Sequence, residues 1–117
     1  MTEKLPRPKV LPGETTRIAT GCGNMYIQVN FLGTEMFEVF ATLGKAGGCA
    51  KAQCEAISRL ATLALRYSIP IKEIAEEIEN IKCPNIAYDE EGTVLSCPDA
   101  VAKVMKGYLV EEVEDEV

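Results

Sequence analysis

Alternating hydrophobic and polar positions predict β-strands in the first third of the chain. Met25, Ile27 and Val29 alternate with polar or amphipathic neighbours, which is the pattern of a half-buried strand. The preceding residues 16–20 predict a partner strand, joined to it through Gly21-Cys22-Gly23-Asn24, whose glycines suit the positive φ angles of a hairpin. After a turn, residues 36–43 are rich in strand formers and predict a third strand. We therefore expect a three-stranded antiparallel meander.

Helical spacing of hydrophobic residues replaces this alternation after the glycine-rich residues 44–48. One helix is expected from residue 49 to about residue 66 or 67, another after Ser68-Ile69-Pro70, and a third from residue 97. Residues 86–95 predict a short hairpin or loop with an acidic tip at residues 89–92. The predicted fold class is α+β, a three-stranded antiparallel meander followed by two to three helices in a single small domain.

Each expected helix carries a hydrophobic stripe at a spacing of three and four residues. In the first helix the stripe is Cys54, Ile57, Leu60, Ala61 and Ala64. In the second it is Ile71, Ile74, Ala75, Ile78 and Ile81, opposite glutamates that predict a solvated acidic face. In the third it is Val101, Ala102, Val104, Met105, Tyr108 and Leu109. These stripes predict the helical side of the core, and Cys54 is expected to belong to it.

The start of the third helix combines a capping sequence with a cysteine. Ser96 is a good N-cap, Pro98 suits the first helical turn, and Asp99 is placed for a pair resembling a capping box with Ser96. Cys97 lies at the positive end of this helix, where the macrodipole favours an anion and predicts a lowered thiol pKa. That setting favours a metal ligand or a reactive thiol, and the alternative is a small buried cysteine beside an ordinary cap.

Length and charge narrow the classes of function. A chain of 117 residues predicts one domain. With 12 basic against 18 acidic residues, a net charge of −6 and no histidine, the chain lacks the basic face of a nucleic-acid-binding protein. Neither a signal peptide nor a membrane span is evident, so we expect a cytoplasmic protein. In that compartment its five cysteines favour metal binding or redox chemistry over a disulfide framework.

The two ends of the chain differ in composition from its middle. Residues 1–14 are proline-rich and predict an extended arm, to which we assign no chemistry. Residues 15–110 form the expected domain, and residues 111–117 form an acidic tail. The glycine-rich residues 44–48 could also cradle a phosphate. This interpretation is weak, because the loop matches neither GxxxxGK[ST] nor GxGxxG and its lysine precedes the paired glycines.

Four cysteines occupy comparable places beside glycine or proline. Cys22 lies in the hairpin turn, Cys49 and Cys97 lie at helix starts, and Cys83 lies in the loop after a helix. None belongs to a CxxC pair, so spacing alone is weak evidence for zinc. The positions permit a tetrahedral centre built from separate elements, and four unrelated thiols with local roles remain the alternative.

Five ordered blocks resemble the TSCPD domain. They begin with Gly21-Cys22-Gly23-Asn24-Met25-Tyr26 and Phe37-Glu38-Val39-Phe40, continue with residues 43–50 and Ile81-Lys82-Cys83-Pro84, and end with Ser96-Cys97-Pro98-Asp99 followed by residues 100–102. The resemblance covers about residues 15–109, and Leu95 stands where the name motif has threonine. This domain occurs at the C-terminus of many adenosylcobalamin-dependent (class II) ribonucleotide reductases and as small stand-alone proteins. The resemblance implies that Cys22, Cys49, Cys83 and Cys97 bind a metal.

The resemblance also implies a function. A ribonucleotide reductase needs a large catalytic barrel, which a chain of this length does not supply, so we expect no catalysis by this chain alone, although its family label would be ribonucleoside-diphosphate reductase. The leading hypothesis is a zinc-binding accessory or interaction module that acts with a ribonucleotide reductase subunit in deoxynucleotide metabolism. Iron or an iron–sulfur cluster also suits an all-thiolate site.

Two alternatives stay open at this point. One is a thiol redox module that re-reduces a reductase disulfide, with Cys49 and Cys97 as the activated thiols. The other is a structural domain without metal. Neither the metal, the partner nor the oligomeric state follows from the sequence.

Overall fold

A three-stranded antiparallel sheet forms the first layer of the protein. The computed structural model describes residues 3–44, 48–90 and 92–109, so the tail at 111–117 and most of the glycine-rich loop lie outside the described residues. The strands β1 (Gly13–Thr20), β2 (Gly23–Leu32) and β3 (Glu35–Leu43) pair in the order β1-β2-β3. The predicted meander is therefore confirmed.

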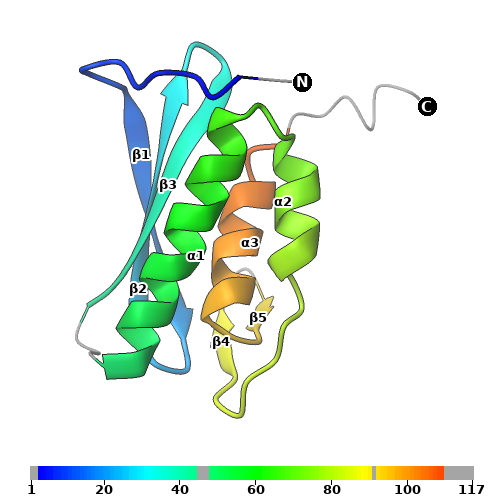
Figure 1. Ribbon diagram of the computed structural model, residues 1–117. Coiled ribbons are helices and arrows are strands. Elements are labelled where there is room, and N and C mark those ends of the chain that lie inside the picture. Colours follow the sequence, from blue (N-terminus) through cyan, green and yellow to red (C-terminus); the bar gives the residue numbers. More distant parts are fainter. Residues whose placement is uncertain (1–2, 45–47, 91, 110–117) are drawn as a thin grey trace.

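Three helices lie on one side of this sheet (Figure 1). They are α1 (Gly48–Arg66), α2 (Ile71–Ile78) and α3 (Cys97–Lys106), and a two-stranded hairpin, β4 (Ala87–Asp89) and β5 (Gly92–Val94), precedes α3. Helix α1 lies along β3, α3 contacts β1 and β2, and α2 packs against α3. The α+β class and the order of elements agree with the sequence prediction. Within the described ranges, no helix is long and apolar enough to cross a membrane.

The core lies between the sheet and the helices. Met25, Ile27 and Val29 of β2 are buried completely, while the intervening Tyr26 and Gln28 face solvent. They meet a second set of buried side chains from α3, namely Val101, Val104 and Met105. Each such residue contributes about 1.5–3 kcal/mol through the transfer of its apolar surface from water. Strand alternation and helical periodicity therefore select the faces that form the core.

Helix α1 is rotated from the orientation that its hydrophobic stripe predicted. Leu60 is 68% exposed, so its predicted burial is wrong. The residues of α1 that are buried are Cys54, Ser58, Ala61 and Leu65. The pattern of hydrophobic residues does not predict this orientation of α1, because hydrogen bonds between α1 and β3 determine it. The edge of β3 offers backbone groups that need partners, and α1 supplies hydroxyls for them.

Two hydroxyl groups of α1 satisfy the free edge of β3. The hydroxyl of Ser58 accepts a hydrogen bond from the backbone N–H of Ala41 at 2.9 Å. The hydroxyl of Thr62 accepts from the N–H of Val39 at 3.0 Å and donates to the carbonyl of the same residue at 3.0 Å. An exposed strand edge invites pairing with other chains. Helix α1 therefore covers an edge of the sheet as well as its face.

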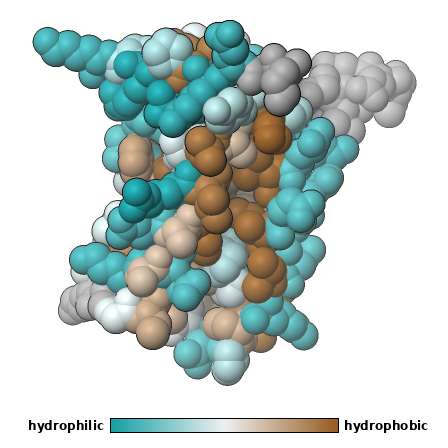
Figure 2. All heavy atoms as spheres, viewed as in Figure 1, coloured by the Kyte–Doolittle hydropathy of each residue, from teal (hydrophilic) through white to brown (hydrophobic). Residues whose placement is uncertain are grey.

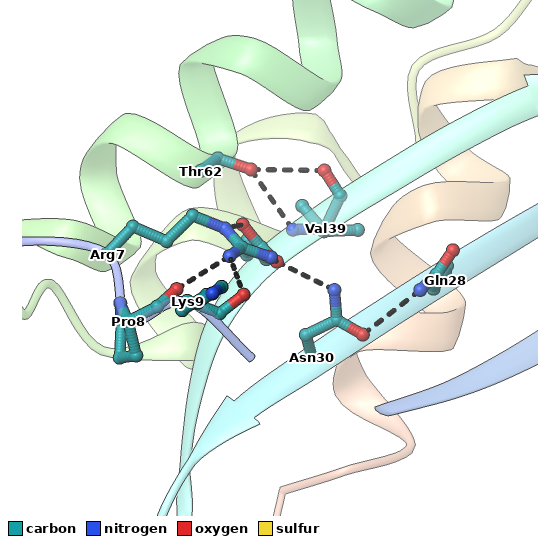
Figure 3. A network of polar contacts seen from close by, with 8 residues as sticks. Arg7, Pro8, Lys9, Gln28, Asn30, Val39 and Thr62 are labelled. Carbon is teal, nitrogen blue, oxygen red and sulfur yellow. Dashed lines mark hydrogen bonds and ion pairs between the residues drawn. The ribbon is translucent and has the colours of Figure 1, made fainter. Parts of the chain in front are cut away.

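The N-terminal arm is held by a buried carboxylate of β3 (Figure 3). The Arg7 guanidinium donates to both carboxylate oxygens of Glu38, at 3.0 and 2.7 Å. The Asn30 side chain donates to Glu38 at 2.7 Å, and the carbonyl of Leu5 accepts from the Arg66 guanidinium at 2.8 Å. The last two residues of the predicted arm, Gly13 and Glu14, already belong to β1, and the rest of the arm is anchored by specific polar contacts that the sequence did not reveal.

Candidate functional site

The turns and helix starts that carry four of the cysteines lie at the same end of the molecule. Figure 1 shows there the β1–β2 turn, the start of α1, the loop between α2 and β4, and the start of α3. Cys22, Cys83 and Cys97 are half-buried, Cys49 is exposed, and Cys54 is buried; all five are free thiols. The topology thus gathers residues separated by up to 75 positions, from Cys22 to Cys97, into one region.

The hairpin turn holds Cys22 through a buried threonine. The Thr20 hydroxyl accepts a hydrogen bond from the backbone N–H of Cys22 at 3.1 Å and donates to the carbonyl of Gly23 at 2.7 Å. Gly23 has a φ of 116°, a conformation that strongly favours glycine. The turn geometry predicted from the sequence is therefore present, and Thr20 fixes the direction in which Cys22 is presented.

The thiol of Cys97 does not have the lowered pKa that its helix position predicted. Burial, together with the nearby thiols of Cys54 and Cys22, raises the pKa of Cys97 to about 12, although a hydrogen bond with the Thr20 side chain acts in the opposite direction. Burial likewise raises the pKa of Cys54, which interacts with Cys97 through their thiols. Desolvation of the thiolate outweighs the helix macrodipole here. The prediction of an activated thiolate at Cys97 is therefore wrong.

The N-cap of α3 is present and extends beyond the predicted pair. The Ser96 hydroxyl accepts a hydrogen bond from the N–H of Asp99 at 3.1 Å and donates to the carbonyl of Ile81. We expected the Asp99 carboxylate to complete a pair resembling a capping box with Ser96, but its oxygens have other partners. They accept instead from the backbone N–H groups of Asn80 at 2.7 Å and Leu95 at 3.0 Å. The cap therefore ties the end of α2 to the start of α3.

These bonds place the loop that contains Cys83. The N–H of Cys83 donates a hydrogen bond to the carbonyl of Leu95 at 3.1 Å. Because Leu95 lies two residues before Cys97 in the sequence, this bond holds Cys83 near the start of α3. Its thiol donates to the carbonyl of Asn85 at 3.3 Å. Asn85 in turn packs so closely on Gly21 that a Cβ there would collide with its backbone carbonyl. The Cys83 loop thus rests on the hairpin tip beside Cys22.

The two remaining cysteines differ in their surroundings, since Cys54 is buried and Cys49 is exposed. Cys54 is 1% exposed and belongs to the core, as predicted, but it also neighbours Cys97 and Cys22, which the sequence analysis missed. Its place on the predicted hydrophobic stripe was the available signal, since a thiol in the core can meet Cys97, which packs against the core at the start of α3. Cys49 is the second residue of α1 and is exposed, and it is not among the cysteines that influence the Cys54 and Cys97 thiols.

The donor set agrees in kind with a zinc site. Thiolate sulfur is the usual ligand of structural zinc, and Cys22, Cys83 and Cys97 are brought together by packed elements. The arrangement is not closed, because the described residues contain no group of three or more Cys, His, Asp or Glu side chains positioned to hold a metal ion.

The fold and the thiols define a small α+β domain in which a meander and three helices place cysteines at one end. The TSCPD domain model matches residues 1–109. The chain therefore belongs to the TSCPD domain family, and the matched segment includes the N-terminal arm. No curated protein and no solved structure matches the chain.

Proposed function

We propose that this protein is a zinc-binding accessory module that acts with a ribonucleotide reductase. Membership of the TSCPD family, a domain known from these reductases, supports the association. The observation that carries the metal proposal is the convergence of the Cys22 turn, the Cys83 loop and the Cys97 helix start. The partner is a reductase subunit, and the module itself performs no reduction of ribonucleotides.

The proposed ligands are Cys22, Cys49, Cys83 and Cys97. Zinc would supply a structural cross-link among four separate elements and would keep their thiols deprotonated. Thr20 orients Cys22, and the Ser96 and Asp99 cap holds the segments that present Cys83 and Cys97. Cys54 is the competing thiol for the fourth position, because it lies beside Cys97, whereas Cys49 is exposed.

Metal analysis of single-cysteine variants tests this proposal. The protein purified under reducing conditions is expected to contain one zinc per chain by elemental mass spectrometry. Cys22→Ser, Cys83→Ser and Cys97→Ser should each lose most of it. Comparison of Cys49→Ser with Cys54→Ala identifies the fourth ligand. The variant that lowers the zinc affinity has lost the ligand, and the other variant should bind zinc as the wild type does. A wild-type protein that remains without metal after reconstitution with zinc would overturn the proposal.

A redox module is the second candidate, favoured by the direct interaction between Cys54 and Cys97. In this function their two thiols would transfer two electrons and two protons to a reductase disulfide, leaving a Cys54–Cys97 disulfide and a reductase dithiol. A cellular dithiol would then regenerate the module by thiol–disulfide exchange. Mass spectrometry of the alkylated protein after mixing with a peptide that contains a disulfide decides this: a Cys54–Cys97 disulfide supports it, and unchanged thiols exclude it.

A further inference from the structure

The outer side of α1 carries hydrophobic residues that the single chain leaves in solvent. Leu60 is 68% exposed and Leu63 is 42% exposed. Tyr67, which follows the helix and is still bonded to it through the carbonyl of Leu63, is 39% exposed. These residues lie on the side of α1 that faces away from the sheet. Figure 2 shows hydrophobic side chains gathered between α1 and α2, along one border of this face.

The exposed residues follow the spacing of a coiled-coil seam. Positions separated alternately by three and four residues, all of them exposed, are Gln53, Ala56, Leu60, Leu63 and Tyr67. This is the a/d pattern over two heptads, which presents one narrow stripe to a facing helix. The residues of α1 that are buried, Cys54, Ser58, Ala61 and Leu65, form a separate stripe that faces the core. Helix α1 therefore has two contact faces, and the fold uses one of them.

Two grooves of opposite charge flank this ridge. The groove between α1 and α2 has a volume of about 390 Å³ and is lined mainly by hydrophobic side chains, with Glu73 and Glu77 as its charged residues. The groove on the other side of α1 has a volume of about 460 Å³, and its charged lining residues are Lys4, Arg59 and Arg66. Arg59 also forms an exposed ion pair with Glu55 at 3.3 Å, which leaves the lysine and the second arginine as the unshared positive charges of this side. Leu60 lines both grooves. The ridge thus has an acidic flank towards α2 and a basic flank towards β3.

We propose that a second copy of this chain docks on the outer face of α1, with the two α1 helices parallel about a twofold axis. A twofold axis that runs along the helices places the acidic flank of each copy opposite the basic flank of its partner. An antiparallel pair would instead oppose acidic to acidic and basic to basic. In parallel coiled coils, charges beside the seam select partner and orientation in the same way. The charge arrangement therefore identifies both the occupant and its direction.

The surface is also preformed for such contact. Ser58 and Thr62 fix the inner side of α1 to the backbone of β3, so the ridge is held in one orientation. The helix has 19 residues and spans about 28 Å, which is long enough for two heptads. Docking on a rigid face costs little ordering entropy, which favours association between identical surfaces.

Sedimentation equilibrium in a reducing buffer tests the proposed dimer. The wild-type chain should associate reversibly to a dimer. Leu60→Asp should weaken association by about tenfold or more, because the change is present in both copies at the centre of the seam. Val10→Asp is the matched control, since Val10 is 79% exposed but lies on the N-terminal arm; it should leave the dimer unchanged. Circular dichroism checks that both variants are folded.

Charge reversal tests the orientation. Glu73→Lys with Glu77→Lys should weaken the dimer by opposing two basic flanks, and the further changes Lys4→Glu and Arg59→Glu should restore it by inverting both flanks. A wild-type protein that remains monomeric at all concentrations overturns the proposal. A dimer that withstands Leu60→Asp also overturns it, and failure of the quadruple variant to regain association overturns the parallel arrangement.

Discussion

At the scale of single residues, buried polar groups of this protein have defined partners. Asp99 is fully buried, and its carboxylate accepts two backbone N–H groups and lies 3.4 Å from the Lys103 ammonium. Among the described residues, no buried side-chain nitrogen or oxygen lacks a hydrogen-bond partner. An unpaired buried group costs more than a hydrogen bond gains, so such residues are sensitive points of the fold.

Replacement of Asp99 by alanine should destabilise the protein strongly. The change leaves the N–H groups of Asn80 and Leu95 without acceptors and loosens the junction between α2 and α3. The expected loss in free energy of unfolding is about 2–5 kcal/mol, measured by urea denaturation. Asp99→Asn, which keeps one acceptor, should lose less. Glu76→Ala, a change on the exposed side of α2, serves as control, and an equal loss there would contradict this role of Asp99.

The Arg7–Glu38 pair gives the protein an acid-sensitive contact. Burial disfavours the Glu38 carboxylate, but hydrogen bonds from Arg7 and Asn30 outweigh it and lower the pKa of Glu38 below its ordinary value of 4.5. As the pH falls, Glu38 is therefore protonated at a higher pH in the unfolded chain than in the folded protein. The contribution to stability is therefore complete above about pH 4.5 and is lost as the pH falls through the lowered pKa.

Thermal melts between pH 3 and pH 7, roughly the range of carboxyl titration, measure this contribution. Compared with wild type, Glu38→Gln should lose less stability on acidification. Arg7→Ala should reduce or reverse the acid dependence, because burial then dominates and raises the pKa of Glu38. If the three proteins follow parallel pH curves, the pair contributes nothing to acid sensitivity.

At the scale of elements, local patterns were sufficient for most of the fold. Alternation identified β2, and Ser96 marked the start of α3, because each depends on neighbours within a few residues. The orientation of α1 was not accessible in this way. It depends on hydroxyls that meet β3 about 20 residues away in sequence, as for Thr62 and Val39 with a separation of 23. The pKa of Cys97 was missed for the same reason, since Cys54 and Cys22 approach it only in the folded chain.

The edge contact between α1 and β3 predicts a clear effect of one isosteric change. Thr62→Val keeps the shape of the side chain but removes both bonds to Val39, leaving an unpaired backbone N–H and carbonyl at the covered edge. A loss of about 1–3 kcal/mol in free energy of unfolding is expected. The matched control is Thr42→Val, because Thr42 is exposed on the same strand. Equal stability of the two variants would show that the hydroxyl of Thr62 is dispensable.

The contact between the hairpin and the Cys83 loop predicts a link to metal binding. In Gly21→Ala the added methyl group would meet the backbone carbonyl of Asn85, so the Cys83 loop must move away from Cys22. Zinc affinity should fall by about tenfold or more, as for other changes that disturb ligand orientation. Gly44→Ala is the control, since its nearest atoms lie at an ordinary contact distance of 3.6 Å. Competition with a chromophoric chelator measures both affinities.

At the scale of the whole molecule, the cysteine end and the α1 ridge are separate surfaces. The former is built from turns and helix starts, and the latter runs along the side of one helix (Figures 1 and 2). Metal binding would stabilise the junctions between elements, whereas dimer formation would bury a face that the fold already holds rigid. The two proposals therefore have different consequences for stability and can be tested separately in one set of variants.

The rise in melting temperature on zinc binding distinguishes the proposed metal site from the proposed dimer. A ligand that binds only the folded state stabilises it by about 2.7 kcal/mol at a hundredfold excess over its dissociation constant. For a domain of this size that corresponds to a rise of about 10 °C or more in melting temperature. Wild type and Leu60→Asp should show the same rise with zinc, because Leu60 lies beyond the middle of α1 and the cysteines of this helix lie near its start. Cys97→Ser should show none. If Leu60→Asp loses the zinc response while it remains folded, the two surfaces are coupled and the metal site depends on the dimer.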